Sequence, residues 1–295
     1  MDLIWQALVP VQDLARLFGR VLTGEKTLFA FAALTLVLFV DFTRRRFRPS
    51  WSRKAVTGVF ATFVIMLLNI AFAPVAYFAT EAAQAVYDAF NIPRLPGSLW
   101  QAFPAWLLAV TAIVAHDFAN YWNHRAMHHR WLWPIHAIHH SDQAMTGATL
   151  FRVHIFETIW MQVSYIFLLS WLGFPPGAAG IGAFLITLHG IYVHMNLDWG
   201  HGPFSLALAS PRYHRWHHAD HKPAYGKNLA NIVPLFDYLF GTYYMPGTCD
   251  KPLGAKGVSH DDPVKLMLHP LVEWSRAASR ALRKLPPGRS ADEAN

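Results

Sequence analysis

The stretch from Ala55 to Thr80 carries no charged side chain, and nearly all of its residues are apolar. Since the hydrocarbon core of a bilayer is about 30 Å thick, roughly 20 apolar residues in a helix are enough to cross it. In water, a helix that is apolar on every face has to be buried on every face. This stretch therefore predicts a helix that spans a membrane.

Other apolar stretches predict further membrane helices, and the composition of the chain agrees with them. Hydrophobic residues make up 54% of the sequence and charged residues 15%, whereas an average soluble domain is about 25% charged. We therefore expect an all-α, polytopic integral membrane bundle of four or five hydrophobic helices. Besides 55–80, the predicted spans are residues 27–40, 100–115, 155–174 and 177–194.

The orientation of these spans follows from a basic cluster between the first two, with the sequence TRRRFRPSWSRK. Short loops rich in Lys and Arg stay in the cytoplasm. Alternating the spans then places residues 116–154, and everything after His194, on the cytoplasmic side. We expect a multi-pass protein of the cell inner membrane or the endoplasmic reticulum. Its net charge of +7 fits this topology, and we expect no nucleic-acid partner because no basic stripe with interleaved aromatic residues accompanies that charge.

Histidine is the second unusual feature, because 15 of the 17 histidines lie between His116 and His221. Their spacings of three and four residues place side chains on one face of a helix. Pro134 predicts the first turn of one such helix, and Ser210 with Pro211 predicts the start of another. The three resulting clusters are His124 and His128, then His136, His139 and His140, and finally His214, His217 and His218.

Eight clustered imidazoles predict a metal site, because they would repel one another if protonated and leave buried polar atoms if unpaired. A zinc ion takes about four protein ligands, so eight imidazoles favour two metals. With Cys249 as the only cysteine, iron–sulfur ligation is excluded. A di-iron site fits, and it can activate O₂ for attack on a lipid C–H bond, a redox task that zinc cannot perform.

The chain resembles the fatty acid hydroxylase and sterol desaturase superfamily of membrane di-iron oxygenases. The resemblance covers about residues 115–245 and includes, in the family's order, DFANYWNHRAMHH, WPIHAIHHS, RVHIFE, HMNLDWG, SPRYHRWHH and FDYLFGTY. It implies hydroxylation or desaturation of a fatty acyl chain, a sterol or a related bilayer lipid at two iron ions, with O₂ as co-substrate. Zinc is a metal that overexpressed protein can acquire instead.

The same resemblance implies the catalytic and metal-ligating residues. They are the eight clustered histidines together with His194, which ends the last predicted span. The full set is His124, His128, His136, His139, His140, His194, His214, His217 and His218. Two electrons must come from outside the chain, and because the sequence has no Rossmann or flavin fingerprint we expect a separate cytochrome, ferredoxin or reductase as donor.

We expect three regions along the chain. Residues 1–110 hold N-terminal membrane helices, and residues 111–250 form the catalytic domain, whose cytoplasmic helical cap holds the di-metal site. Residues 251–295 form a C-terminal tail with a surface helix after Pro270.

Several residues keep two interpretations. His116 and His189 are either additional ligands or packing residues, and His221 either caps the histidine cluster or binds metal weakly. Arg152, His154 and Glu157 are either site residues, as the family resemblance implies, or a salt-bridged helix start. We expect Asp117 and Asp237 to accept the second N–H of ligand imidazoles. His201, His260 and His269 are expected to be ordinary polar positions. Six tryptophans of the catalytic region belong either to a lipid channel or to an interfacial belt, and we favour the belt for most of them. They are Trp122, Trp131, Trp133, Trp160, Trp199 and Trp216.

Two other functions are compatible with a histidine-rich membrane protein. The first is a zinc-dependent membrane hydrolase, which the absence of an HExxH motif and the excess of histidine disfavour. The second is a non-enzymatic metal-binding protein such as a transporter or store. For a transporter, polar residues are expected inside several spans, whereas these spans are nearly free of them.

Overall fold

The computed structural model describes residues 52–283, and all regular structure in this range is helical apart from one isolated bridge between Ala219 and Leu253. The all-α prediction is therefore confirmed. The elements are α4 (Arg53–Ala71), α5 (Ala73–Ala89), α6 (Gly97–Gln101), α7 (Ala105–Met127), α8 (Trp133–His140), η1 (Gly147–Phe151), α9 (Ile155–Leu169), η2 (Ser170–Leu172), α10 (Pro176–His194), η3 (Gly202–Phe204), α11 (Pro211–His217), η4 (Lys222–Ala224), α12 (Leu235–Leu239) and α13 (Pro263–Leu282).

Three helical segments of the described chain are long and apolar enough to cross a membrane. They are Arg53–Ala71, Ile155–Leu172 and Gly177–His194. The stretch predicted at 27–40 lies outside the described residues. The stretch predicted at 100–115 is divided between α6 and the first half of α7.

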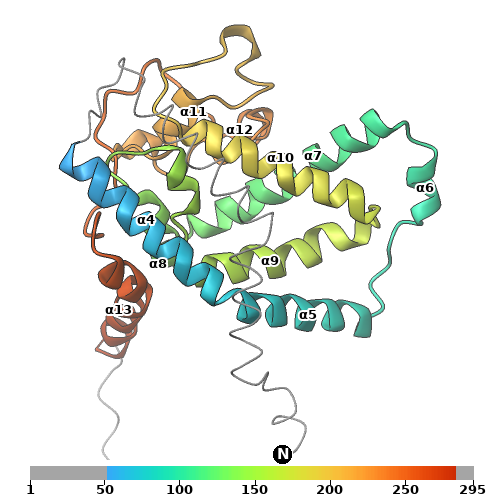
Figure 1. Ribbon diagram of the computed structural model, residues 1–295, viewed down its shortest axis with the longest axis horizontal. Coiled ribbons are helices and arrows are strands. Elements are labelled where there is room, and N and C mark those ends of the chain that lie inside the picture. Colours follow the sequence, from blue (N-terminus) through green and yellow to red (C-terminus); the bar gives the residue numbers. More distant parts are fainter. Residues whose placement is uncertain (1–51, 284–295) are drawn as a thin grey trace, which may run out of the picture.

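The expected single helix over residues 55–80 is wrong, because the chain breaks at Phe72 into α4 and α5. Pro74 is the physical reason. It has no backbone N–H to donate to the preceding turn, and its ring clashes with a continuing helix. In the first turn of α5 the same residue is tolerated, and the two helices run in different directions from this point (Figure 1).

The helices of the bundle bring distant parts of the histidine-rich sequence to one end. Helix α5 packs beside α9, and α7 packs against both α9 and α10. The last turns of α7 and α10 and the first turn of α9 lie together at the left of Figure 1, where α8 and α11 also lie. We call this the histidine end of the bundle.

The outside of the bundle presents large apolar side chains. Phe60, Tyr77, Phe78, Trp106 and Phe184 are each more than half exposed. Exposure of so many large apolar side chains is unusual for a soluble monomer. Together with the three long apolar helices, it indicates a bundle whose sides contact lipid.

The C-terminal segment differs from the expected tail. Helix α13 begins at Pro263, where Asp262 caps its first N–H groups, and Pro270 lies inside it. The expectation of a surface helix that starts after Pro270 is therefore wrong. Leu266 is fully buried against Ile65 of α4 and Ile138 of α8, so one face of α13 belongs to the core beside the histidine-bearing helix.

Arg152 connects the segments around this core. Its side chain is fully buried, and its Nε donates to the carbonyl oxygen of Ile138 at 3.2 Å and to Ser141 Oγ at 2.9 Å. Its Nη1 donates to the Gly58 carbonyl oxygen at 3.2 Å, and its Nη2 donates to the carbonyl oxygen of His260. One guanidinium thus joins α4, the end of α8 and the segment before α13.

His260 is not the ordinary polar position that we expected. Only 9% of it is exposed. Its Nε2 donates to the Lys54 carbonyl oxygen at 2.7 Å, and its Nδ1 accepts from the Gln143 backbone N–H at 3.1 Å. It therefore adds a second connection between α4 and the C-terminal segment.

Replacing Arg152 with Met should lower the free energy of unfolding by about 3–5 kcal/mol, because several buried acceptors lose their donor together. Thermal unfolding of the purified protein in detergent measures this loss. Arg130→Met, at an exposed position, serves as the control and should change the midpoint little. Equal melting of the two variants would show that Arg152 does not connect these segments.

Candidate metal centre

Short helices with well-defined starts carry the histidine clusters. Helix α8 has Pro134 in its first turn, and α11 begins at Pro211 after Ser210, whose side chain accepts from the Tyr213 N–H at 3.2 Å. His194 ends α10, and His128 is the C-cap of α7. The predicted helix starts at 134 and 210–211 thus occur in the structure.

The structure brings all nine predicted ligand residues together, in two adjacent groups. Within each group, one nitrogen atom per residue lies within 4.8 Å of the others. The five-histidine group is His124, His128, His136, His140 and His217, and the four-histidine group is His139, His194, His214 and His218. Each group contains imidazoles alone, without a carboxylate or thiol.

Hydrogen bonds at Nδ1 determine which form several of these imidazoles take. The Nδ1 of His124 lies 2.7 Å from the Leu229 carbonyl oxygen, that of His217 lies 2.7 Å from the Lys227 carbonyl oxygen, and that of His194 lies 2.6 Å from the Gly190 carbonyl oxygen. A carbonyl oxygen only accepts, so each Nδ1 carries the hydrogen. In the neutral ring Nε2 then presents a lone pair.

The Nε2 atoms of His124 and His194 face the Nε2 atoms of other grouped histidines. His124 Nε2 lies 3.0 Å from His136 Nε2, and His194 Nε2 lies 2.9 Å from His214 Nε2 and 3.1 Å from His139 Nε2. Where both nitrogens lack a hydrogen, such an approach is repulsive and a cation between them relieves it. Among the described residues, buried ring nitrogens of His128, His217 and His218 have no hydrogen-bond partner. The donor set therefore fits metal ions, one in each group.

Burial keeps these rings neutral. It lowers the pKa of His136, His140, His214, His217 and His218 well below the usual 6.5, and neighbouring histidines lower it further. Neutral imidazole is the form that ligates metal. At neutral pH the site is therefore ready to bind a cation without first losing protons.

Glu157 is the one carboxylate that contacts a grouped histidine among residues 52–283. Its Oε1 accepts from His136 Nδ1 at 2.9 Å, and both side chains are buried. This contact orients the ring and increases its basicity. Of the two interpretations kept for Glu157, the structure favours the site residue.

Asp117 and Asp237 contact backbone N–H groups and not, as we expected, the imidazoles. Asp237 accepts from the backbone N–H groups of Leu229 and Ala230 at 2.7 and 2.8 Å. Asp117 accepts from three consecutive N–H groups, at residues 231–233. The predicted direct contact with imidazoles is wrong. The two carboxylates hold the loop 227–233, whose carbonyl oxygens accept from the histidines.

The remaining histidines lie outside both groups. His116 contacts the Ala112 carbonyl oxygen through Nδ1 at 2.8 Å, and His154 caps α9 by accepting from the Phe156 N–H. His189 is part-buried in α10, and His221 packs its ring near Trp216. The geometry gives these four residues packing and capping positions.

A cavity of about 410 Å³ extends from the histidines between α7, α9 and α10, and the sequence did not reveal it. Its lining includes members of both groups and continues along Asn120, Tyr165 and Ile186. Asn120 lies one turn before His124, and Tyr165 lies two turns after Glu157, so helical spacing could have indicated them. The cavity is predominantly apolar and adjoins the helices that contact lipid.

A second cavity of about 470 Å³ reaches the five-histidine group from the other side, past Trp133 and Lys256. Trp133 lies with its ring 5.3 Å from that of His128 and 5.2 Å from that of His140. Trp216 is 4% exposed and donates to the Gly247 carbonyl oxygen. Trp216 therefore does not belong to an interfacial belt, whereas Trp131 and Trp199 are well exposed, as residues of such a belt would be.

Comparison with known proteins agrees with this geometry. Residues 109–242 match the model of the fatty acid hydroxylase family. Human alkylglycerol monooxygenase is 25% identical over 254 residues, which are 84% of this chain and 53% of that protein. Ornithine lipid hydroxylase OlsE of Rhizobium tropici is 34% identical over 150 residues, 49% of this chain and 44% of that protein.

A plant relative also matches. Very-long-chain aldehyde decarbonylase GL1-11 of Oryza sativa subsp. indica is 28% identical over 165 residues, 53% of this chain and 60% of that protein. The chain spans about half the length of the relatives it matches. No solved structure matches it significantly.

Replacing Glu157 with Ala should weaken metal binding about 10–100-fold, because the Nδ1 of His136 loses its acceptor. Glu157→Gln keeps an oxygen acceptor and should lose less. Competition with a chelator, followed by metal analysis of the protein, measures both. The role of Glu157 is refuted if the Ala variant releases metal at the same chelator concentration as the unmodified protein.

Asp237→Asn should selectively empty the five-histidine group. An Asn side chain has one acceptor oxygen where the carboxylate of Asp237 has two. Some of the buried groups that donate to Asp237 therefore lose their acceptor, and each loss lowers the free energy of unfolding by about 1–3 kcal/mol. The loosened carbonyl oxygens at 227 and 229 serve only His217 and His124. Metal per chain should fall by about half, while Asp250→Asn, at an exposed residue paired with Lys251, should retain all of it. Equal loss from both groups would contradict this assignment.

Proposed function

Because the chain belongs to the fatty acid hydroxylase family through residues 109–242, we propose that it is a membrane-bound di-iron oxygenase that hydroxylates or desaturates a lipid. The observation that carries the proposal is the pair of all-imidazole groups at the inner end of an apolar cavity. The relatives named as a monooxygenase and a lipid hydroxylase support the same reaction class.

In this proposal each group holds one iron ion, through His124, His128, His136, His140 and His217 in one and His139, His194, His214 and His218 in the other. Iron bound there would supply O₂ activation and abstraction of hydrogen from a C–H bond, which zinc cannot supply. O₂ is the co-substrate. Two electrons come from a separate cytochrome, ferredoxin or reductase.

The protein's own residues would select the C–H bond. The apolar walls contributed by α9 and α10 exclude water and hold an acyl chain, a sterol or a related lipid straight enough to reach the histidines. Asn120 and Tyr165, whose hydroxyl donates to Asn120 Oδ1 at 3.2 Å, add a polar position in the cavity wall. Glu157 keeps the ring of His136 in one orientation beside that chain.

The location is part of the proposal. Lys and Arg residues are concentrated at 44–54, up to and including the first two residues of α4. The rule that such segments stay inside puts the histidine end in the cytoplasm. The protein would then sit in the cell inner membrane or the endoplasmic reticulum. We also propose the division into residues 1–110, the catalytic domain 111–250 and the C-terminal segment 251–295.

The test combines metal analysis with turnover. Purified protein from iron-replete cells should hold about two irons per chain and consume O₂ only with both lipid and reductant. His139→Ala and His217→Ala each remove one ligand, from different groups, and should each lower the iron content and abolish turnover. His129→Ala changes an exposed histidine outside both groups and should leave both properties unchanged.

The product is found by comparing the lipids of cells with and without the chain. A lipid differing by one oxygen or by two hydrogens identifies the substrate and separates hydroxylation from desaturation. Full turnover in both ligand variants, or zinc alone in protein from iron-replete cells, would refute the proposed function.

A further inference from the structure

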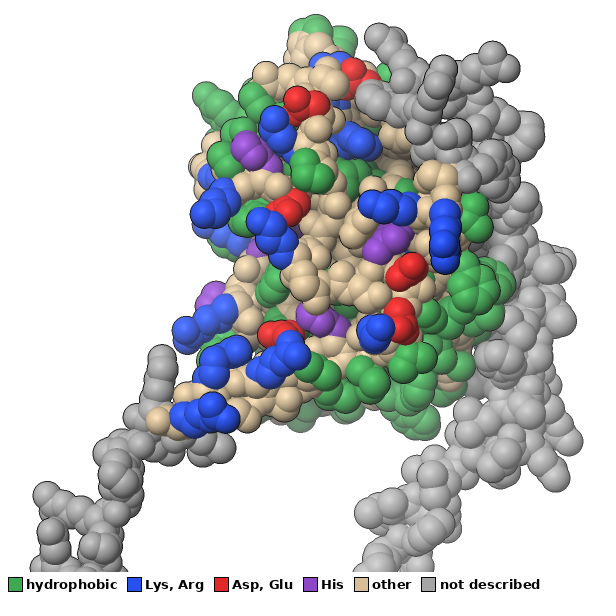
Figure 2. All heavy atoms as spheres, turned by 90° about the vertical axis from the view of Figure 1, so that its left-hand side faces the viewer, with side chains coloured by type: hydrophobic (Ala, Val, Ile, Leu, Met, Phe, Trp, Pro, Cys, Tyr) green, Lys and Arg blue, Asp and Glu red, His purple; other side chains and the backbone are tan. Residues whose placement is uncertain are grey.

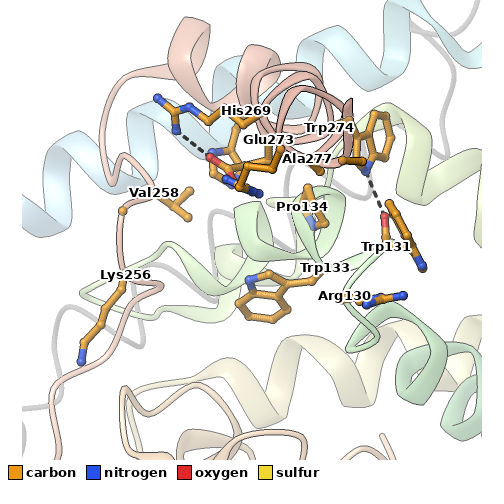
Figure 3. Close-up of a pocket in the computed structure, with 14 residues that line it drawn as sticks. Arg130, Trp131, Trp133, Pro134, Lys256, Val258, His269, Glu273, Trp274 and Ala277 are labelled. Atoms are coloured by element: carbon orange, nitrogen blue, oxygen red, sulfur yellow. Dashed lines mark hydrogen bonds and ion pairs between the residues drawn. The ribbon is translucent and has the colours of Figure 1, made fainter. Parts of the chain in front are cut away.

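A groove of about 660 Å³ lies beside α13, between this helix and residues 130–134 and 256–258 (Figure 3). It contains none of the nine grouped histidines. Its lining includes four cationic side chains, those of Arg130, Lys256, Arg276 and Arg280. Among its lining residues Glu273 is the one carboxylate. The groove is therefore electropositive.

The positive charge of the groove is only partly neutralised. Arg276 pairs with Glu273 at 2.7 Å, and Lys256 lies 3.7 Å from Asp220. Arg130 rests over the ring of Trp131. Within residues 52–283, neither Arg130 nor Arg280 has a carboxylate in ion-pair distance. These two guanidinium groups remain available to an anion.

Helix α13 has a separate apolar face that is open to its surroundings. Val264, Leu268, Leu271 and Val272 are 40–65% exposed, and their spacing places them on one stripe. The groove residues 269, 273, 276 and 280 have the same spacing on another stripe of the helix. An exposed apolar stripe beside a basic one is typical of a helix that lies in the plane of a membrane interface.

Helix α13 is attached to the bundle at the depth where a membrane span begins. The ring of Trp274 stacks on that of Phe156, with centroids 6.0 Å apart, and its Nε1 donates to the Trp131 carbonyl oxygen at 3.0 Å. Phe156 lies in the first turn of α9, where a candidate membrane span begins. Tryptophan is enriched at the depth of lipid headgroups.

The wider surface has the same character. Figure 2 looks onto the histidine end of the bundle and shows Lys and Arg side chains over much of this face, with hydrophobic side chains gathered along its lower right edge. The charged part of such a face is suited to contact with water, and its border is suited to contact with negatively charged headgroups. At the groove, basic side chains and the exposed apolar residues of α13 lie on the same helix.

We propose that this groove binds the phosphate of an anionic bilayer phospholipid, with α13 lying in the membrane interface. The guanidinium groups of Arg130 and Arg280 donate to the phosphate oxygens, and Arg276 adds the part of its guanidinium group that does not contact Glu273. The planar fork of Arg matches a phosphate in two-point contact. The exposed apolar stripe explains why the source is a bilayer lipid. A soluble acidic protein would pair with the charges and leave that stripe uncovered.

This site would connect membrane composition with the metal centre. Helix α13 packs on α8, the helix that carries His136, His139 and His140. A headgroup bound between α13 and residues 130–134, where α8 begins, would hold these two helices together. The inference does not depend on the reaction proposed above, because it concerns lipid binding alone.

Native mass spectrometry of the full chain in detergent tests the site, with dioleoyl phosphatidylglycerol and dioleoyl phosphatidylcholine as probes. The unmodified chain should retain phosphatidylglycerol in preference. Arg276→Gln with Arg280→Gln should bind it about 30-fold more weakly, since two surface cations are lost. Lys222→Gln with Lys251→Gln removes the same charge outside the groove and should change the affinity less than about twofold.

Further measurements distinguish a bilayer lipid from free phosphate and from a protein partner. Arg276→Lys with Arg280→Lys keeps the charge and should retain most of the binding, and inorganic phosphate should not displace the lipid. Unchanged affinity for phosphatidylglycerol in the Gln variant would overturn the proposal, as would displacement by inorganic phosphate alone. If that variant instead loses binding to an acidic [2Fe–2S] ferredoxin while keeping the lipid, the groove is a protein-docking surface and the proposal is wrong.

Discussion

The approach of the imidazole lone pairs of His124 and His136 to 3.0 Å is the constraint on which the rest of this structure depends. Neutral rings that have already given their N–H to a carbonyl or carboxylate oxygen repel one another at this distance. A cation between them turns the repulsion into ligation. The fold must therefore hold nine rings against one another from helices that are far apart in the sequence.

Two sets of buried hydrogen bonds hold the helix ends in place. The loop 227–233 is fixed by Asp117 and Asp237, and its carbonyl oxygens orient His124 and His217. Arg152 joins α4, α8 and the segment before α13 through its guanidinium group. The apolar sides of the bundle leave this polar assembly at one end, next to the cavity that reaches toward the lipid-facing helices.

The local features of the site could be predicted from the sequence, because they depend on spacing within one helix. Positions 136, 139 and 140 must share a helix face, and Pro134 and Ser210 mark where the helices begin. The division of the nine histidines into groups of five and four could not be predicted, since it depends on how four helices meet. His194 was identified through the family resemblance alone.

The expectations that proved wrong for Asp117 and His260 concern contacts between segments that are distant in the sequence. Asp117 lies more than 110 residues from the loop that it holds, and no spacing rule connects the two. His260 looked ordinary because its partners Lys54 and Gln143 lie far away in the sequence. The break at Phe72 was a local signal that the apolar pattern obscured, since Pro74 lies within a stretch that reads as one span.

The most direct test is an anomalous difference map at the iron absorption edge, from crystals of the full chain purified from iron-replete cells. The account predicts two peaks, one among His124, His128, His136, His140 and His217 and the other among His139, His194, His214 and His218. A single peak, a peak outside both groups, or no peak at all would contradict it.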